Sequence, residues 1–296
     1  MIALLTRLIF LIAECVVGGI ILRYIRLMFT YIKFSIKSVA AYRGAFVLNF
    51  ISQFISYGVE FALMWIMVNS FDSMNGWTKY EVMLLFAMSL ASYSLAGFFF
   101  FSSTSFVRNG VKNGAFDDVM LKPVYILPFL ICSNFNLGYV SHMTLSIIMI
   151  IVCLINLNIN IGFFNLLYLV ISIIAGAFIY GALFLLCSTP TFFKTKLNSL
   201  MKFVFFLRQM SFYPLSIFSK SFQFILSFII PYGMINFYPI QAVIKKEDFL
   251  MFDSYMQFVP PFFSVLLFTI SVVYFNFGVK PVSYTHLRAH ETLRHL

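Results

Sequence analysis

The sequence predicts an all-α protein that crosses a membrane several times. Of its 296 residues, 61% are hydrophobic and 10% are charged, whereas an average soluble domain has about 25% charged residues. A mean hydropathy of +0.95 leaves too little polar surface to cover a globule in water, so the surface must meet lipid. The apolar runs are long and continuous, which favours helices over a membrane barrel, because barrel strands alternate polar and apolar residues.

Four apolar stretches each predict one membrane-spanning helix. Residues 82–107, 221–244 and 254–279 contain no charged residue, and residues 44–71 contain only Glu60. Each stretch is long enough to cross a hydrocarbon core of about 30 Å as a helix.

A fifth stretch, residues 123–193, is also uncharged. As one helix it would measure on the order of 100 Å, so it has to cross the membrane twice. Asn156, Asn158, Asn160 and Gly162 are typical of a reversal between the two helices. We therefore expect six spans, at 45–68, 82–103, 126–154, 164–187, 216–237 and 257–279.

The basic residues predict the orientation of the spans, because cytoplasmic loops retain Lys and Arg. The loops assigned to the cytoplasm carry Arg23, Arg26, Lys33, Lys37, Arg43, Arg108, Lys112, Lys122, Lys194, Lys196, Lys202 and Arg208. The opposite loops carry Lys79, Lys245 and Lys246, which are balanced by Asp72, Glu81, Glu247, Asp248 and Asp253. We expect a multi-pass protein with both termini in the cytoplasm. The formal charge of +10 then reflects topology and attraction to anionic membrane lipid rather than binding of nucleic acid.

The two ends of the chain are interpreted separately. Residues 281–296 contain VSYTHLRAHET, which resembles a translated sequencing adaptor, and we expect this tail to be non-native. Residues 1–22 form an apolar extension. It is explained by a seventh span, by an uncleaved signal-like segment or by a misassigned start, and the misassigned start is favoured. In residues 23–43, basic residues alternate with apolar ones, which predicts an amphipathic helix on the inner membrane face. Residues 44–280 remain as one six-helix transmembrane domain.

No motif predicts catalysis within this chain. The phosphate-loop pattern G-x-x-x-x-G-K-[ST] is absent, so any ATPase has to be a partner, and we expect neither enzymatic activity nor a cofactor or metal. The cysteines are isolated in apolar segments, where we expect buried thiols; they are Cys15, Cys132, Cys153 and Cys187. His142 is expected to donate a hydrogen bond between helices rather than to relay protons.

Glu60 lies near the middle of the first predicted span, in ISYGVEFALMW. An ionised group at that depth costs at least a few kcal/mol in lipid, so it should face protein or water. Two interpretations stay open: Glu60 lines a translocation path or subunit interface, or it is a protonated carboxyl bonded to a neighbouring helix.

Two segments carry further signals. In FVRNGVKNGAFDDVMLKPVYILPF, Gly114 permits a turn, Asp117 and Asp118 suit the first turn of a short helix, and Pro123 ends it. Pro231 lies inside the predicted fifth span and should kink or interrupt that helix.

Three motifs in this order, N-G-A-F-D-D-V-M-L-K-P-V, F-Y-P-L-S-I-F and I-I-P-Y-G-M-I-N-F-Y-P, resemble the ABC-2 type permeases. The similarity covers about residues 24–280 and is strongest to a bacterial subgroup of six-helix exporter permeases of mostly unassigned substrate. It implies a plasma-membrane permease, as a homodimer or a paralogous heterodimer, that exports a lipid, peptide or hydrophobic drug with energy from a separate ATPase subunit. The rival hypotheses are a secondary transporter that uses Glu60 and, less favoured, a membrane-embedded enzyme.

The resemblance also assigns roles to residues. In the family, a short helix after the second span fits a groove on the ATPase. It therefore implies that residues 114–123, here called the coupling segment, contact the ATPase through Gly114, Asp117, Asp118, Leu121, Lys122 and Pro123. The alternative is a merely solvated loop. Glu60 and Pro231 are expected at the translocation path or a helix interface.

Overall fold

The computed structural model describes residues 2–70, 73–158, 162–193, 198–246 and 254–294. Side chains are described within these ranges from Leu22 to Lys280, Asn198 excepted. In these residues every regular element is a helix, apart from an isolated bridge between Met74 and Trp77. The prediction of an all-α fold is confirmed.

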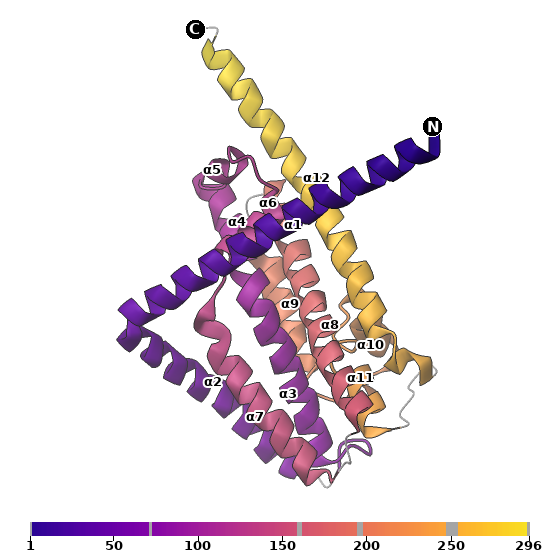
Figure 1. Cartoon of the computed structure of the whole chain (residues 1–296). Coiled ribbons are helices and arrows are strands. Elements are labelled where there is room, and N and C mark those ends of the chain that lie inside the picture. Colours follow the sequence, from indigo (N-terminus) through magenta and orange to yellow (C-terminus); the bar gives the residue numbers. More distant parts are fainter. Residues whose placement is uncertain (1, 71–72, 159–161, 194–197, 247–253, 295–296) are drawn as a thin grey trace.

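Five helices in the described part of the chain are long and apolar enough to cross a membrane. They are α2 (Arg43–Asn69), the continuous rod of α3 (Lys79–Ala96), η1 (Gly97–Phe101) and α4 (Ser102–Asn113), then α7 (Val140–Asn156), α8 (Phe163–Ser188) and α12 (Pro260–Arg294). Figure 1 shows them as a bundle of roughly aligned helices. They correspond to five of the six predicted spans.

The predicted fifth span, 216–237, is not one helix. The chain instead forms η4 (Leu215–Ile217), α10 (Lys220–Phe224) and η5 (Ile225–Ile229), and later α11 (Phe237–Ile244). Because α10 and η5 have five residues each, together they reach only about 15 Å, half of a hydrocarbon core. No helix long enough to cross a membrane covers this stretch, and no sixth long apolar helix occurs among the described residues, so the count of six spans stays a prediction.

The interruption at Pro231 was predicted correctly. Helix η5 ends at Ile229, directly before the Ile230–Pro231 peptide, since proline disfavours helical backbone in the residue before it. The chain then folds back, and the Gly233 N–H donates to the Leu226 carbonyl over 2.8 Å. Asn236 fixes the turn to the core by donating to the carbonyls of Leu85 and Ser211, at 3.1 and 2.6 Å.

The predicted third span, 126–154, is divided. It consists of α6 (Ile126–Ser133), η2 (Leu137–Tyr139) and α7, so only its second part is a long helix. Asn136 causes the break locally, because its side-chain oxygen accepts from the Gly138 N–H at 2.8 Å and replaces a helical bond. Helix α6 remains at the end of the bundle.

Helix α1 (Ile2–Ala41) lies across the same end of the bundle as α5 and α6 (Figure 1). It is continuous, so residue 22, the expected limit of the N-terminal extension, is not a break in the helix. The Tyr125 N–H donates to the Tyr24 hydroxyl at 2.7 Å, which ties α1 to the start of α6. The basic side chains of Arg23, Arg26, Lys33 and Lys37 are exposed.

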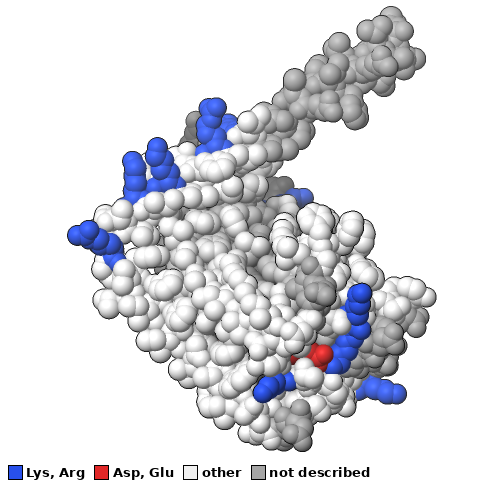
Figure 2. Space-filling view, turned by 60° about the horizontal axis from the view of Figure 1, so that its bottom comes forward, with Lys and Arg blue, Asp and Glu red and all other residues white. Residues whose placement is uncertain are grey.

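The outer surface has the charge distribution of a membrane protein. Figure 2 shows basic side chains gathered at two opposite ends, with a broad uncharged region between them. Large apolar side chains are exposed on α2, α7, α8 and α12, among them Ile55, Ile66, Ile151, Ile155, Ile171, Ile174, Leu266 and Ile270. Such a surface is stable in lipid and would aggregate in water.

The core is centred on α3, where nearly every side chain is buried. Helix α8 lies close against it because Gly176 has no side chain: a Cβ there would overlap Ser92. Small residues permit such close backbone approach between membrane helices.

Candidate functional site

The coupling segment begins with the left-handed turn predicted at Gly114, whose φ is +76°. The turn is closed by the Phe116 N–H, which donates to the Gly110 carbonyl at 3.2 Å, and by the Asp117 N–H, which donates to the Gly114 carbonyl at 3.1 Å. Asp117 and Asp118 then occupy the first turn of α5 (Asp117–Met120), as the sequence predicted. The helix is a single turn long.

An aromatic chain attaches this turn to the bundle. Phe116 is fully buried, and its ring centre lies 5.1 Å from that of Phe192 in η3 (Thr189–Phe192). Phe192 in turn lies 5.5 Å from Phe275 of α12, measured between ring centres. These contacts link α5 to η3, which directly follows α8, and to α12.

The outer side of the coupling segment is open to solvent. Leu121 is 80% exposed, and Asp118, Lys122 and Pro123 are exposed beside it. Asp117 is only partly exposed, and the Lys122 Nζ lies 4.7 Å from the centre of the Phe129 ring. An exposed leucine flanked by both charge signs on a fixed turn is suited to contact another protein.

Glu60 lies on the exposed side of α2. It follows the start of the helix at Arg43 by about 26 Å and precedes its end by about 14 Å, well inside the apolar region. The neighbouring outward positions are apolar, including Val59 and Leu63. Only Met64 and Val68 of this helix are buried, so α2 has the least covered surface of the long helices.

A cleft of about 320 Å³ opens beside Glu60. Its walls come from α2, from Phe86 of α3 and from the chain around the end of α9 (Asn198–Met210). Except for Glu60 and Gln209 the lining is mainly apolar, and it comprises Leu63, Met64, Met67, Phe86, Met210, Phe212 and Tyr213.

A second cavity of about 290 Å³ lies nearer the α1 end and is polar. Its lining residues are Asn49, Gln53, Tyr57, Tyr93, Asn136, Gly138, Tyr139 and His142. His142 packs edge-on against Tyr57, with ring centres 4.2 Å apart, and its Nδ1 is 3.3 Å from the Ser141 hydroxyl.

One face of α2 connects the two cavities. Asn49, Gln53, Tyr57 and Glu60 follow each other at intervals of four, four and three residues, which places them on one side of a helix. Of these four polar residues, only Glu60 was identified from the sequence, although their spacing is visible there. The polar stripe shows that Glu60 is part of a continuous line of polar side chains.

Arg208 was assigned to a cytoplasmic loop, and this was wrong. It belongs to α9 and is 7% exposed. Its guanidinium carbon lies 4.3 Å from the centre of the Tyr93 ring and 5.3 Å from that of Phe212. The burial of Arg208 could not be predicted from the positions of charges along the chain. It depends on how α9, a short helix with a charge near each end, contacts distant helices.

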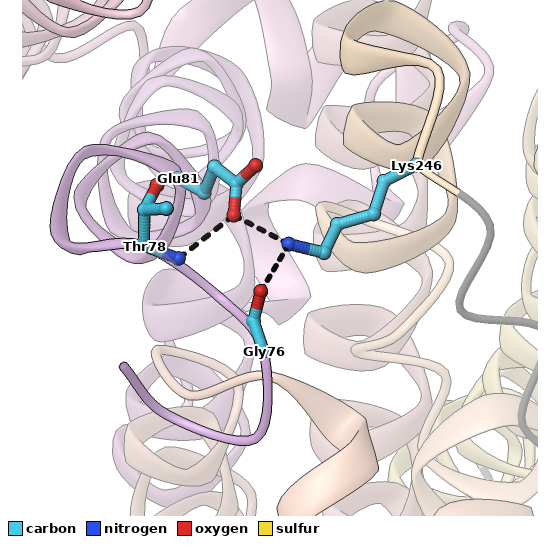
Figure 3. A network of polar contacts seen from close by, with 4 residues as sticks. All are labelled: Gly76, Thr78, Glu81 and Lys246. Atoms are coloured by element: carbon cyan, nitrogen blue, oxygen red, sulfur yellow. Dashed lines mark hydrogen bonds and ion pairs between the residues drawn. The ribbon is translucent and has the colours of Figure 1, made fainter. Parts of the chain in front are cut away.

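At the opposite end of the molecule a polar network joins α3 to α11 (Figure 3). Lys246 Nζ lies 2.6 Å from Glu81 Oε2 and donates to the Gly76 carbonyl at 2.6 Å. The same carboxylate accepts from the Thr78 N–H at 2.8 Å and caps α3. Of the charges predicted to balance at this end, Asp72, Glu247, Asp248 and Asp253 lie outside the described residues, as do Lys194 and Lys196 of the other end.

A bundle of long apolar helices with a broad uncharged outer surface is the architecture of a multi-pass membrane protein. Residues 54–286 match the family described as ABC-2 family transporter protein, and the chain belongs to this family. It is the membrane component of such a transporter; permeases of this family are typically non-catalytic, and the ATPase lies in a separate subunit. Comparison with curated proteins and with solved structures gave no match.

Proposed function

We propose that this chain is the permease subunit of an ATP-driven exporter in a bacterial plasma membrane. Two such subunits, identical or paralogous, pair with two cytoplasmic ATPase subunits and move a lipid, peptide or hydrophobic drug. The observation that carries the proposal is the coupling segment, which is exposed at its tip yet joined through Phe116 to α8 and α12.

Coupling requires that the ATPase bind the coupling segment differently in its open and closed states. Leu121 and Asp118 offer an apolar and a charged contact for such binding. Movement of α5 is passed on through the rings of Phe116 and Phe192, because buried aromatic contacts do not compress. The transmembrane helices then shift together with the ATPase.

The second supporting feature is the bare surface of α2. An ionised Glu60 facing lipid would be costly, so a second subunit covers this face and a water-accessible path runs along the polar stripe. Helix α1 carries exposed basic side chains and lies at the same end of the bundle as the coupling segment (Figure 1). In this arrangement that end, with both termini, is the cytoplasmic side.

The test is coexpression with the phosphate-loop ATPase encoded beside the gene. Wild-type chain should retain the ATPase during purification in detergent, whereas Asp118→Lys and Leu121→Asp should lose it while still inserting into the membrane. Lys245→Glu, a charge reversal at an exposed residue of the opposite end, is the matched control. If both coupling-segment variants still copurified with the ATPase in unchanged amounts, the segment would be a solvated loop and not an ATPase contact.

The alternative of a secondary transporter is distinguished by its energy source. Transport in vesicles that requires a proton gradient, persists without the ATPase and is abolished by Glu60→Gln would favour it. ATP-dependent transport that is insensitive to a protonophore would exclude it.

A further inference from the structure

We propose that the transported substrate is an amphiphile with an anionic head group, phosphate or carboxylate, and that Arg208 binds this head group. The inference rests on the proposed transport function and adds the chemical class of the substrate and the residue that selects it.

The first argument is the state of the guanidinium. Arg208 is more than nine-tenths buried, and among the described residues its Nε and Nη1 have no hydrogen-bond partner. Tyr93 and Phe212 offer it ring faces, which attract a cation but accept no conventional hydrogen bond from these N–H groups. A buried charge with unused donors is costly unless an acceptor occupies them for part of the working cycle.

The second argument is the chemistry of the missing acceptor. Guanidinium presents its N–H groups as a planar fork that matches two oxygens of one phosphate or carboxylate. Glu60 is near enough to attract Arg208 electrostatically, but no ion pair joins the two in the described structure. Tyr180 also lies beside the guanidinium as a side-chain hydrogen-bond partner. Only Nε and Nη1 therefore remain available to an anion from outside the chain.

The third argument is position. Arg208 lines neither cavity itself but contacts one lining residue of each, because Tyr93 lines the polar cavity and Phe212 lines the apolar cleft. The polar cavity lies nearer the α1 end: Asn49 and Gln53 follow the start of α2 by about 9 and 15 Å. An inner-leaflet lipid has the same order, with its head toward the cytoplasm and its chain toward the membrane centre.

Binding and release follow from the same groups. The aromatic rings shield the guanidinium, so the head group reaches the N–H fork when a ring turns aside. Glu60 lies on the rim of the cleft, where its carboxyl group competes with a bound anion for Arg208. Removing the charge of Glu60 should therefore tighten anion binding, the opposite of the effect of removing Arg208.

The experiment measures binding to the purified full chain in dodecyl maltoside, with monododecyl phosphate as the probe and dodecanol as its neutral counterpart. We expect monododecyl phosphate to bind more tightly than dodecanol and than inorganic phosphate. Arg208→Gln should weaken binding at least about tenfold, the typical loss for a charge-assisted pair. Glu60→Gln should strengthen it severalfold. Arg26→Gln, at an exposed arginine of α1, is the control and should leave affinity unchanged.

Several results would overturn the proposal. One is equal binding of monododecyl phosphate and dodecanol. Another is an affinity for inorganic phosphate equal to that for monododecyl phosphate, which would make free phosphate the ligand. The third is unchanged binding of monododecyl phosphate to Arg208→Gln. If Arg208→Gln does not fold, Glu60→Gln decides: unchanged or weaker anion binding in it refutes the role of Arg208. The assay contains no ATPase, so a failure of ATP-driven transport with anion binding retained counts against the proposed function alone.

Discussion

The ring of Phe116 packs against the ring of Phe192, with 5.1 Å between their centres, and this contact joins the exposed turn of α5 to the end of α8. Phe116 is buried although it lies within a short surface loop. The loop is therefore held as a fixed projection of the bundle, which is the property that a coupling element needs.

Loss of this ring should separate ATPase binding from transport. In Phe116→Ala, Leu121 and Asp118 remain in the loop, so the ATPase should still copurify, but its hydrolysis should no longer drive transport. The cavity also costs about 3–5 kcal/mol of stability, so Phe116→Leu serves as the milder variant. ATP hydrolysis and transport measured together in proteoliposomes check this. Full transport in both variants would show that force does not pass through Phe116.

Neutralising Glu60 should impair transport and leave insertion intact. The side chain is exposed on α2, so Glu60→Gln should reach the membrane in normal amounts. Ser56→Ala, at an exposed residue one turn earlier, is the control and should transport normally. Wild-type transport rates in Glu60→Gln would restrict Glu60 to a structural role.

The Glu81 and Lys246 pair should contribute to stability. Each side chain is at most 20% exposed, and removing one partner leaves the other charge poorly solvated, so Lys246→Met should lower stability by about 1–3 kcal/mol. A double-mutant cycle with Glu81→Gln, followed by thermal unfolding in detergent, isolates the interaction. Strict additivity of the two losses would mean that the pair is not coupled.

A methyl group at Gly176 should force α8 away from α3. The added Cβ would overlap Ser92, and overpacking of this kind costs about 1–3 kcal/mol. Gly44→Ala is the matched control, because nothing lies within 4 Å of a Cβ at that position, and it should be neutral or slightly stabilising. Equal unfolding temperatures for the two variants would show that the close approach is not required.

Local signals in the sequence predicted local structure well. Uncharged runs located the long helices, Gly114 marked a left-handed turn, and Pro231 marked the interruption of a helix, because each of these effects depends on the residue itself. The two aspartates of α5 were placed correctly for the same reason.

Features that depend on distant contacts were not predictable in this way. Arg208 was read as a loop charge, yet its environment is made by Tyr93 of α3 and by Phe212 beyond α9. The fifth span, with its interruption at Pro231, was expected to cross the membrane because hydropathy does not distinguish a crossing helix from a segment that folds back inside protein. Three buried thiols, Cys132, Cys153 and Cys187, agree with the sequence expectation, whereas the side chain of Cys15 lies outside the described residues.

The most direct test of the central claim is site-specific crosslinking at Leu121. A photoreactive amino acid at this position, in chain coexpressed with the ATPase of the same locus, should form a covalent adduct with that ATPase, and the yield should change when ATP is bound. The same amino acid at Lys245 should give no adduct. Absence of the adduct at residue 121, or equal yields at the two positions, would contradict coupling through this segment.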